Sequence, residues 1–307
     1  MRAFTLDSFE SPPGLRDDLP VPDMGPNEVR VRVHASSVNP ADAAIATGML
    51  KGMAEYEFPV TLGRDYAGVV EEVGSGVKGY SAGDEVFGFI LHANPTVHDG
   101  SWADYVVVPE DMSIARKPVG VDVAIAGAAP LAALAALAAF DALELSEGAT
   151  VLVLGATGGV GSVFVQLAAA AGATVIAPAL PEDRDYLQEL GAGEIIDREA
   201  DVRSHVREHH PEGVDGLLDL VSFAPDDSVL KPEGRLASSL GAAGEGPGRT
   251  NVMASPTTSH LERLGQLLAA GSLRIPIQRT YPLEQANAAL ESLAGTHTQG
   301  KLAIEIA

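Results

Sequence analysis

Alternating apolar and polar positions dominate the first third of the chain and predict β-strands. Residues 29–35 place a valine at every second position between polar residues, which is the period of a strand with one buried face. Three further apolar runs follow, separated by glycine-rich turns, at residues 66–74, 84–90 and 102–108. Short strands at this spacing predict a small, barrel-like β domain.

The pattern changes near residue 120, where short apolar runs begin to alternate with helical segments rich in Ala and Leu. The expected helices are residues 162–171, 183–190 and 201–210, and the expected strands are residues 151–154, 174–177, 194–197, 214–221 and 234–240. Repeated β-α-β units with apolar strands predict a parallel, doubly wound sheet. The fold class is therefore α/β, with a β domain followed by a second domain that holds this sheet.

One apolar segment has to be weighed as a membrane span. Residues 123–140 are 18 residues without a charge, which is about the shortest length that crosses a bilayer. The segment is mostly alanine, however, and contains Gly127 and Pro130, so few of its residues favour insertion strongly. The composition predicts a buried, tightly packed helix instead.

Composition narrows the possible chemistry. The 307 residues include 42 acidic and 20 basic side chains, a net charge of −22, and no cysteine. Disulfides, Cys-ligated zinc, iron–sulfur clusters and thiol nucleophiles are excluded. The acidic balance argues against nucleic acid or an anionic membrane as a partner. The first residues lack the apolar run of a signal peptide, so we expect a cytoplasmic protein.

A glycine-rich loop follows the first strand of the predicted parallel sheet and opens a helix. Such a loop lets a dinucleotide pyrophosphate approach the backbone at Gly158 and lets the helix pack closely at Gly161, while free N–H groups at the helix start face the phosphates. The predicted cofactor-binding residues of this loop are Thr157, Gly158, Gly159, Val160 and Gly161.

The choice of dinucleotide depends on the end of the next strand. An NAD site usually has an acidic residue there for the ribose 2′-hydroxyl, whereas residues 177–180 of this chain are Ala, Pro, Ala and Leu. Arg184 and Arg198 follow the second and third strands, and a guanidinium suits a 2′-phosphate, which favours NADPH. Glu182 and Asp183 would repel that phosphate, and either arginine has the alternative role of a solvated helix-end charge.

Several segments, in order along nearly the whole chain, resemble the zinc-free NADPH:quinone oxidoreductase branch of the medium-chain dehydrogenase/reductases. The segments that carry the resemblance are residues 37–42, 58–70, 83–88 and 100–105, the glycine loop, residues 190–192 and residues 300–302. The resemblance implies a GroES-like catalytic domain of residues 1–119, completed by residues 276–307, and a Rossmann NADPH-binding domain of residues 120–275. It also implies an active site in the cleft between the two domains.

The resemblance also indicates whether the chain can bind a catalytic zinc ion. In the zinc-dependent alcohol dehydrogenases of this superfamily, a Cys and a His stand where this chain has Asn39 and Arg64, and the third ligand would fall near Pro130. Neither an amide nor a guanidinium assembles the usual three-ligand catalytic zinc site. We therefore expect no metal, and hydride transfer to an acceptor that is already electrophilic, such as a quinone, enone or enal.

Three residues are the catalytic candidates that the resemblance implies. Asn39 would donate its amide N–H to the acceptor oxygen or to the nicotinamide ribose, and Arg64 would supply a cationic donor. The alternatives are that Asn39 is a turn residue before Pro40 and that Arg64 pairs with Asp65. Many relatives carry a Tyr five residues after the Asn, where this chain has an alanine, and Tyr56 is the nearest tyrosine that would replace it.

A second metal pattern occurs at residues 205–209, which match the H-x-x-E-H motif of one metalloprotease class. The spacing places His205 and His209 on one helical face. Because this helix also carries Arg203 and Arg207 and ends at Pro211, the sequence favours a charged, solvent-facing helix over a metal site.

The sequence thus predicts a zinc-independent oxidoreductase that transfers hydride from NADPH to a quinone or activated alkene. Two alternatives stay open: an enoyl-thioester reductase, and a nucleotide-binding sensor without catalytic activity. The resemblance further implies a homodimer paired through edge strands of the Rossmann sheet, with that edge strand just before residues 273–277.

Overall fold

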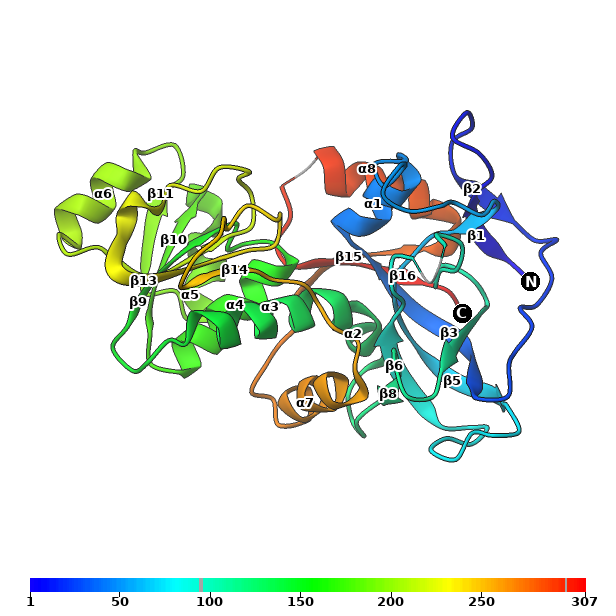
Figure 1. The fold of residues 1–307 in the computed structure, drawn as a ribbon. Coiled ribbons are helices and arrows are strands. Elements are labelled where there is room, and N and C mark those ends of the chain that lie inside the picture. The colour runs from blue at the N-terminus through cyan, green and yellow to red at the C-terminus, as the bar shows by residue number, and fades with distance from the viewer. Residues whose placement is uncertain (94–95, 296) are drawn as a thin grey trace. The chain divides into compact units, whose positions relative to one another are not determined.

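The computed structural model describes residues 1–93, 96–295 and 297–307, which form two compact units (Figure 1). The first unit comprises Met1–Leu131, Ser255–Ser272 and Ile277–Ala307, and the second comprises Ala132–Ala254 and Leu273–Pro276. The chain therefore leaves the first unit and returns to it twice.

The first unit is built on antiparallel strands. Its larger sheet has the order β15-β16-β3-β5-β6-β8, with β7 also paired to β3, and its smaller sheet has the order β2-β1-β4. The strands are β1 (Ala3–Leu6), β2 (Gly14–Arg16), β3 (Glu28–Val38), β4 (Val60–Thr61), β5 (Asp65–Val73), β6 (Glu85–Phe89), β7 (Tyr105–Pro109), β8 (Ala115–Arg116), β15 (Ile277–Pro282) and β16 (Lys301–Glu305).

Strand β3 shows how the predicted alternation places side chains. Val29, Val31 and Val33 are fully buried in the core of the unit. Arg30 and Arg32, between them, pair with glutamates of the neighbouring strand β5. A strand with one buried face therefore forms where the sequence predicts it.

Short helices complete the first unit. They are α1 (Pro40–Ala46), α2 (Val123–Ala128), α7 (Thr258–Ala269), the 3-10 turn η3 (Leu283–Gln285) and α8 (Ala286–Gly295). Residues 120–131 and 255–272, expected in the second domain, belong to this unit. The close approach of α2 to β3 explains part of this difference, since a Cβ on Gly127 would lie 2.7 Å from the Ala35 carbonyl oxygen.

The second unit contains a parallel six-stranded sheet with the order β11-β10-β9-β12-β13-β14. Chain order reverses on either side of β9, which is the doubly wound arrangement. The strands are β9 (Thr150–Leu154), β10 (Thr174–Ala179), β11 (Glu194–Asp197), β12 (Val214–Asp219), β13 (Leu230–Ser238) and β14 (Arg249–Asn251).

The helices of this part of the chain follow the predicted alternation. They are α3 (Pro130–Leu143), α4 (Gly159–Ala170), α5 (Arg184–Leu190) and α6 (Val202–His209), with the 3-10 turns η1 (Pro181–Asp183) and η2 (Asp227–Val229). The expected edge strand before residues 273–277 was misplaced: the outer strand is β14, some twenty residues earlier, because α7 intervenes.

The apolar segment 123–140 is divided between α2 and α3, and α3 begins at Pro130. Alanines along both helices are buried. Within the described residues, no helix has the length and apolar character needed to cross a membrane.

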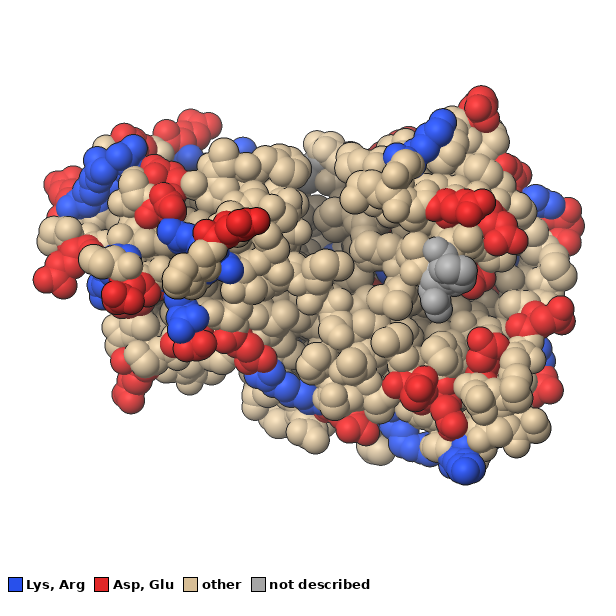
Figure 2. All heavy atoms as spheres, viewed as in Figure 1, with Lys and Arg blue, Asp and Glu red and all other residues tan. Residues whose placement is uncertain are grey.

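Acidic and basic side chains are interspersed on the surface shown in Figure 2. Burial of a charge is rare: among the described residues the buried charged side chains are Asp42, Arg64, Asp65, Asp183, Asp219 and Lys301. Four of these six form one cluster in the first unit, as the contacts below show.

Candidate active site

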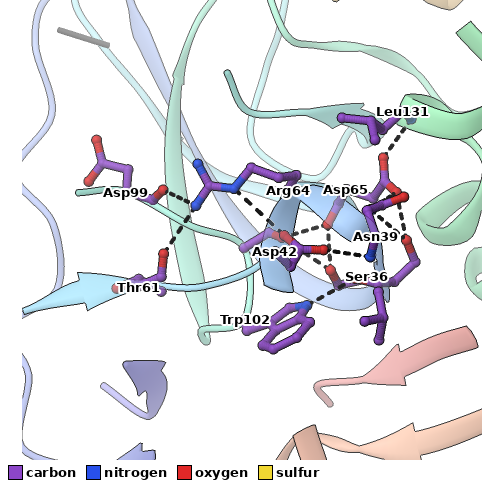
Figure 3. Close-up of polar contacts among 12 residues, drawn as sticks. Ser36, Asn39, Asp42, Thr61, Arg64, Asp65, Asp99, Trp102 and Leu131 are labelled. Carbon is purple, nitrogen blue, oxygen red and sulfur yellow. Dashed lines mark hydrogen bonds and ion pairs between the residues drawn. The ribbon is translucent and has the colours of Figure 1, made fainter. Parts of the chain in front are cut away.

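The cluster forms where β3 ends and α1 begins (Figure 3). Asn39 follows the last residue of β3 and is the N-cap of α1, with Pro40 as the first helical residue. The Asp42 carboxylate accepts a hydrogen bond from the Asn39 backbone N–H at 2.7 Å, which satisfies a donor that the helix start leaves free. Because Asp42 caps the backbone, the Asn39 side chain remains available for other partners.

Asp65, the first residue of β5, is the hub of the cluster. Its Oδ2 accepts hydrogen bonds from Ser37 Oγ at 2.6 Å and from Asn39 Nδ2 at 2.8 Å. Its Oδ1 accepts one from the Leu131 backbone N–H at 2.7 Å. The Lys301 ammonium lies 3.6 Å from Oδ2. A fully buried carboxylate is thus supplied with three hydrogen bonds and a cation, as burial of a charge requires.

Arg64 is fully buried, and its guanidinium points into the protein. Nη1 donates to the Leu91 carbonyl oxygen at 2.9 Å, and Nη2 donates to the carbonyl oxygens of Thr61, at 3.1 Å, and Asp99. The two Nη atoms therefore link the backbone at Thr61, Leu91 and Asp99. The carboxylate partner of Arg64 is Asp42 and not Asp65, the alternative that the sequence left open, since Asp65 is occupied by Lys301 and Asn39.

The contact between Arg64 and Asp42 is loose. Nε and Oδ1 are 3.9 Å apart, and neither atom has a hydrogen-bond partner. Burial raises the pKa of the Asp42 carboxyl to about 7, although Arg64 opposes this increase. Burial likewise lowers the pKa of the Arg64 guanidinium. The cluster therefore contains a carboxyl group that titrates near neutral pH.

Tyr56 lies in an aromatic group with Phe9 and Phe58. Its ring centroid is 4.8 Å from that of Phe9 and 6.0 Å from that of Phe58. The phenol donates a long hydrogen bond, 3.4 Å, to the carbonyl oxygen of Ile45 in α1, and burial raises the pKa of Tyr56. Unlike Asn39 and Arg64, Tyr56 is only partly buried.

Trp102, expected on a strand, precedes β7 and is fully buried. Its indole N–H donates to the Ser37 carbonyl oxygen at 3.1 Å. The side chain therefore supports the end of β3 directly beneath the Asp65 cluster.

The glycine loop of the second unit joins β9 to α4 and fits a pyrophosphate. A Cβ on Gly161 would lie 2.1 Å from the Gly155 carbonyl oxygen, so only glycine allows this close packing. A Cβ on Gly158 would meet only one atom, 3.7 Å away, which leaves the backbone there open to a ligand. Gly158 caps α4 without a side chain, and the first N–H groups of the helix remain free for an anion.

Arg184 and Arg198 follow the carboxyl ends of the adjacent parallel strands β10 and β11. Both side chains are exposed, and the Arg198 backbone N–H binds the Ala179 carbonyl oxygen at 3.0 Å. Asp183, which we expected to repel a 2′-phosphate, is buried, and its Oδ2 accepts a hydrogen bond from the Leu180 N–H at 3.1 Å. The carboxylate thus faces its own turn, and Glu182 is the exposed acid of this loop.

The histidines of α6 do not gather around a metal site. The rings of His205 and His209 stack with centroids 4.2 Å apart. His205 Nε2 binds one oxygen of Glu194, and His210 Nε2 binds the other at 2.9 Å. Across residues 1–93, 96–295 and 297–307, no three His, Asp or Glu side chains are placed to hold a metal ion.

Comparisons with known proteins agree with this architecture. Residues 25–118 match the alcohol dehydrogenase GroES-like domain, and residues 190–304 match the zinc-binding dehydrogenase domain. A chloroplast envelope quinone oxidoreductase homolog of Arabidopsis thaliana is 30% identical, over 94% of this chain and 92% of that protein. An NADPH-dependent alkenal/one oxidoreductase of the same plant is 30% identical, over 94% and 75%.

The solved structure of the quinone oxidoreductase from Coxiella burnetii superposes with a TM-score of 0.89 at 30% identity, covering 100% of this chain and 99% of that one. The chain belongs to the medium-chain dehydrogenase/reductase superfamily, in its quinone oxidoreductase branch. It is an oxidoreductase, and its cofactor is a nicotinamide dinucleotide.

Sequence reasoning assigned no role to Asp42 or Lys301 and considered Asp65 only as a partner of Arg64, although all three lie in segments that carry the family resemblance. A charged residue within an otherwise apolar segment is the signal that points to them, since a charge is buried only with partners. The sequence does not reveal which charges meet, because residues 42, 65 and 301 come from α1, β5 and β16.

Proposed function

We propose that this protein transfers hydride from NADPH to a quinone or an activated alkene without zinc. The observation that carries the proposal is the chemical nature of the side chains at positions 39 and 64. They are an amide and a guanidinium, and both form hydrogen bonds to other groups of the protein. Neither is a zinc ligand, and the donor set therefore does not fit the metal of the zinc-dependent relatives. The relatives named for quinone and alkenal/one reduction support this acceptor class.

The roles of the chain's own residues follow from charge. When bound, the dihydronicotinamide would supply a hydride to an electrophilic carbon and would itself be oxidised, and the negative charge that develops on the acceptor oxygen would be neutralised by a proton from solvent. A donor or cation near that oxygen lowers the barrier. We assign this role to Asn39, with Arg64 as the nearby positive charge, and we assign Tyr56 to the wall of the acceptor site.

Two observations support NADPH over NADH. Ala179 ends β10, where an NAD site usually has an acid, and Arg184 and Arg198 extend from the ends of two adjacent strands. In the described part of the chain, neither arginine side chain takes part in an ion pair that would compete with a phosphate. Cytoplasmic location and a homodimer stay predictions from the sequence.

The test is oxidation of NADPH with a panel of quinones, enones and enals, before and after prolonged treatment with EDTA. We expect turnover with at least one acceptor class and no loss after chelation. Loss on chelation that zinc restores would contradict zinc independence. Absence of turnover with every acceptor would leave a nucleotide-binding protein without catalytic activity as the better account.

A further inference from the structure

The last strand of the chain brings a buried ammonium to the start of α1. Antiparallel pairing of β16 with β3 sets Leu302 opposite Val38, so that Lys301 lies beside the β3–α1 junction. Lys301 is 4% exposed. Its Nζ donates to Asn39 Oδ1 and, at 3.2 Å, to the Val38 carbonyl oxygen.

The Asn39 amide is consequently held between opposite charges. Its oxygen faces the Lys301 ammonium, and its nitrogen donates to the Asp65 carboxylate at 2.8 Å. A flipped amide would set its oxygen against the carboxylate and its NH₂ group against the ammonium. Both contacts are buried, where such repulsion is strong, so only one orientation is stable.

The two amide hydrogens differ in how firmly they are held. One of them is shared by the Asp65 carboxylate, at 2.8 Å, and Ser37 Oγ, at 3.3 Å, because these two acceptors lie 2.6 Å from each other on the same side of the amide nitrogen. The other hydrogen points away from both, and in the described part of the chain no acceptor binds it. The Ser37 hydroxyl already donates to Asp65 at 2.6 Å. The second N–H is therefore the one that would bind an acceptor oxygen, while the two charged partners keep the amide in place.

We propose that Lys301 is a positioning residue for acceptor reduction, which fixes the Asn39 amide through its oxygen and so aims the second amide N–H. The inference rests on the proposed function. It makes the C-terminal return of the chain a part of the catalytic apparatus, because β16 supplies the residue that orients the N-cap residue of α1.

A double-mutant cycle tests the proposal. Lys301→Met removes the donor and the charge at similar length, and Lys301→Gln removes the charge but keeps an N–H group. We expect Lys301→Met to lower kcat about ten- to a hundredfold, as misplacement of a reacting group does, with the KM for NADPH within about twofold. Lys301→Gln should lower kcat by a smaller factor. Combined with Asn39→Ala, Lys301→Met should cause no further loss.

The matched control is Lys231→Met, which removes a lysine held 2.8 Å from Asp215 near the amino end of β12 in the second unit, and which should leave kcat unchanged. Melting curves of all variants show whether each one folds. An unchanged kcat in Lys301→Met, or effects of Lys301→Met and Asn39→Ala that simply multiply, would overturn the proposal.

Hydrogen exchange of the Asn39 side-chain amide gives a readout that needs no turnover. The resonance is assigned by its loss in Asn39→Ala. We expect slow exchange in the wild type and at least tenfold faster exchange in Lys301→Met, and equal rates would overturn the positioning role. Should the wild type reduce no acceptor, the proposed function fails, and amide exchange alone then supports or overturns the orientation of Asn39 by Lys301.

Discussion

At the scale of single residues, the first unit buries two pairs of opposite charges. Asp42 faces Arg64 at 3.9 Å, and Asp65 faces Lys301 at 3.6 Å, all four nearly or fully buried. Removing one member of a buried pair leaves its partner uncompensated, which typically costs about 3–5 kcal/mol. The two pairs differ, because Asp65 has three hydrogen bonds besides its cation, whereas one oxygen of Asp42 has none.

Asp42 should therefore make stability depend on pH. Its pKa is about 7 in the folded protein and near 4 in an unfolded chain, so between these values the folded state binds more protons. The stabilisation is fully present below pH 4 and is lost as the pH rises through 7. In urea unfolding, the free energy of unfolding of the wild type should fall relative to that of Asp42→Asn by about 3 kcal/mol between pH 4 and 7. A difference that does not change with pH would contradict this.

Cofactor choice is the second prediction at this scale. Replacing Arg184 and Arg198 together by alanine should weaken the affinity for NADPH ten- to a hundredfold, because a charged hydrogen bond contributes about 1.5–3 kcal/mol. The affinity for NADH should change by no more than about twofold. Fluorescence titration of both cofactors measures this. The control is Arg203→Ala, which removes an exposed arginine of α6 that pairs with Asp226. Wild-type protein that binds NADH as tightly as NADPH would refute the assignment.

At the scale of elements, β9, the glycine loop and α4 form a unit that combines close packing with an open helix N-terminus. The loop turns tightly enough for α4 to pack against it, and the same geometry leaves the N–H groups at the start of α4 open to an anion. We therefore expect packing to depend on Gly161 and cofactor binding to depend on Gly158, so that the two can be separated by mutation.

Gly161→Ala and Gly158→Ala should separate them. A Cβ at residue 161 would lie 2.1 Å from the Gly155 carbonyl oxygen, so Gly161→Ala should lower both the melting temperature and the affinity for NADPH. A Cβ at residue 158 meets nothing closer than 3.7 Å, and the backbone there is extended. Gly158→Ala should therefore leave the melting temperature unchanged and weaken the affinity for NADPH at least tenfold. Equal behaviour of the two variants, in melting and in titration, would show that Gly158 does not approach the cofactor.

The whole molecule combines two units with a net charge of −22. The parallel sheet ends at the short strand β14, the edge through which we expect two copies to pair. A dimer doubles the like charge, and added salt shortens the range of that repulsion from about 30 Å at 0.01 M to about 8 Å at 0.15 M.

Association should therefore tighten as salt is added. Light scattering at increasing ionic strength should show a shift from monomer toward dimer, and shortening β14 by replacing Thr250 with proline should oppose it by removing a ladder donor. A monomer at every salt concentration would contradict the prediction.

Much of the fold was predictable because its signals are local. Alternating valines determine β3, glycine ends α5 at residue 191, and the glycine loop identifies the start of α4. The doubly wound order follows from repeated β-α-β units, since right-handed crossovers leave few other arrangements. The family, the nicotinamide cofactor and the oxidoreductase class were also predicted from motifs that span nearly the whole chain, and the comparisons confirm them.

The tertiary structure decided what depends on distant segments. Only the folded chain shows that Arg64 pairs with Asp42, that Asp65 is the hub, and that Lys301 reaches Asn39 across 262 positions of sequence. It also decided that residues 255–272 return to the first unit before the chain completes the second. The physical reason is that secondary structure follows from neighbouring residues, whereas a buried charge is stabilised only by the partners that folding brings to it.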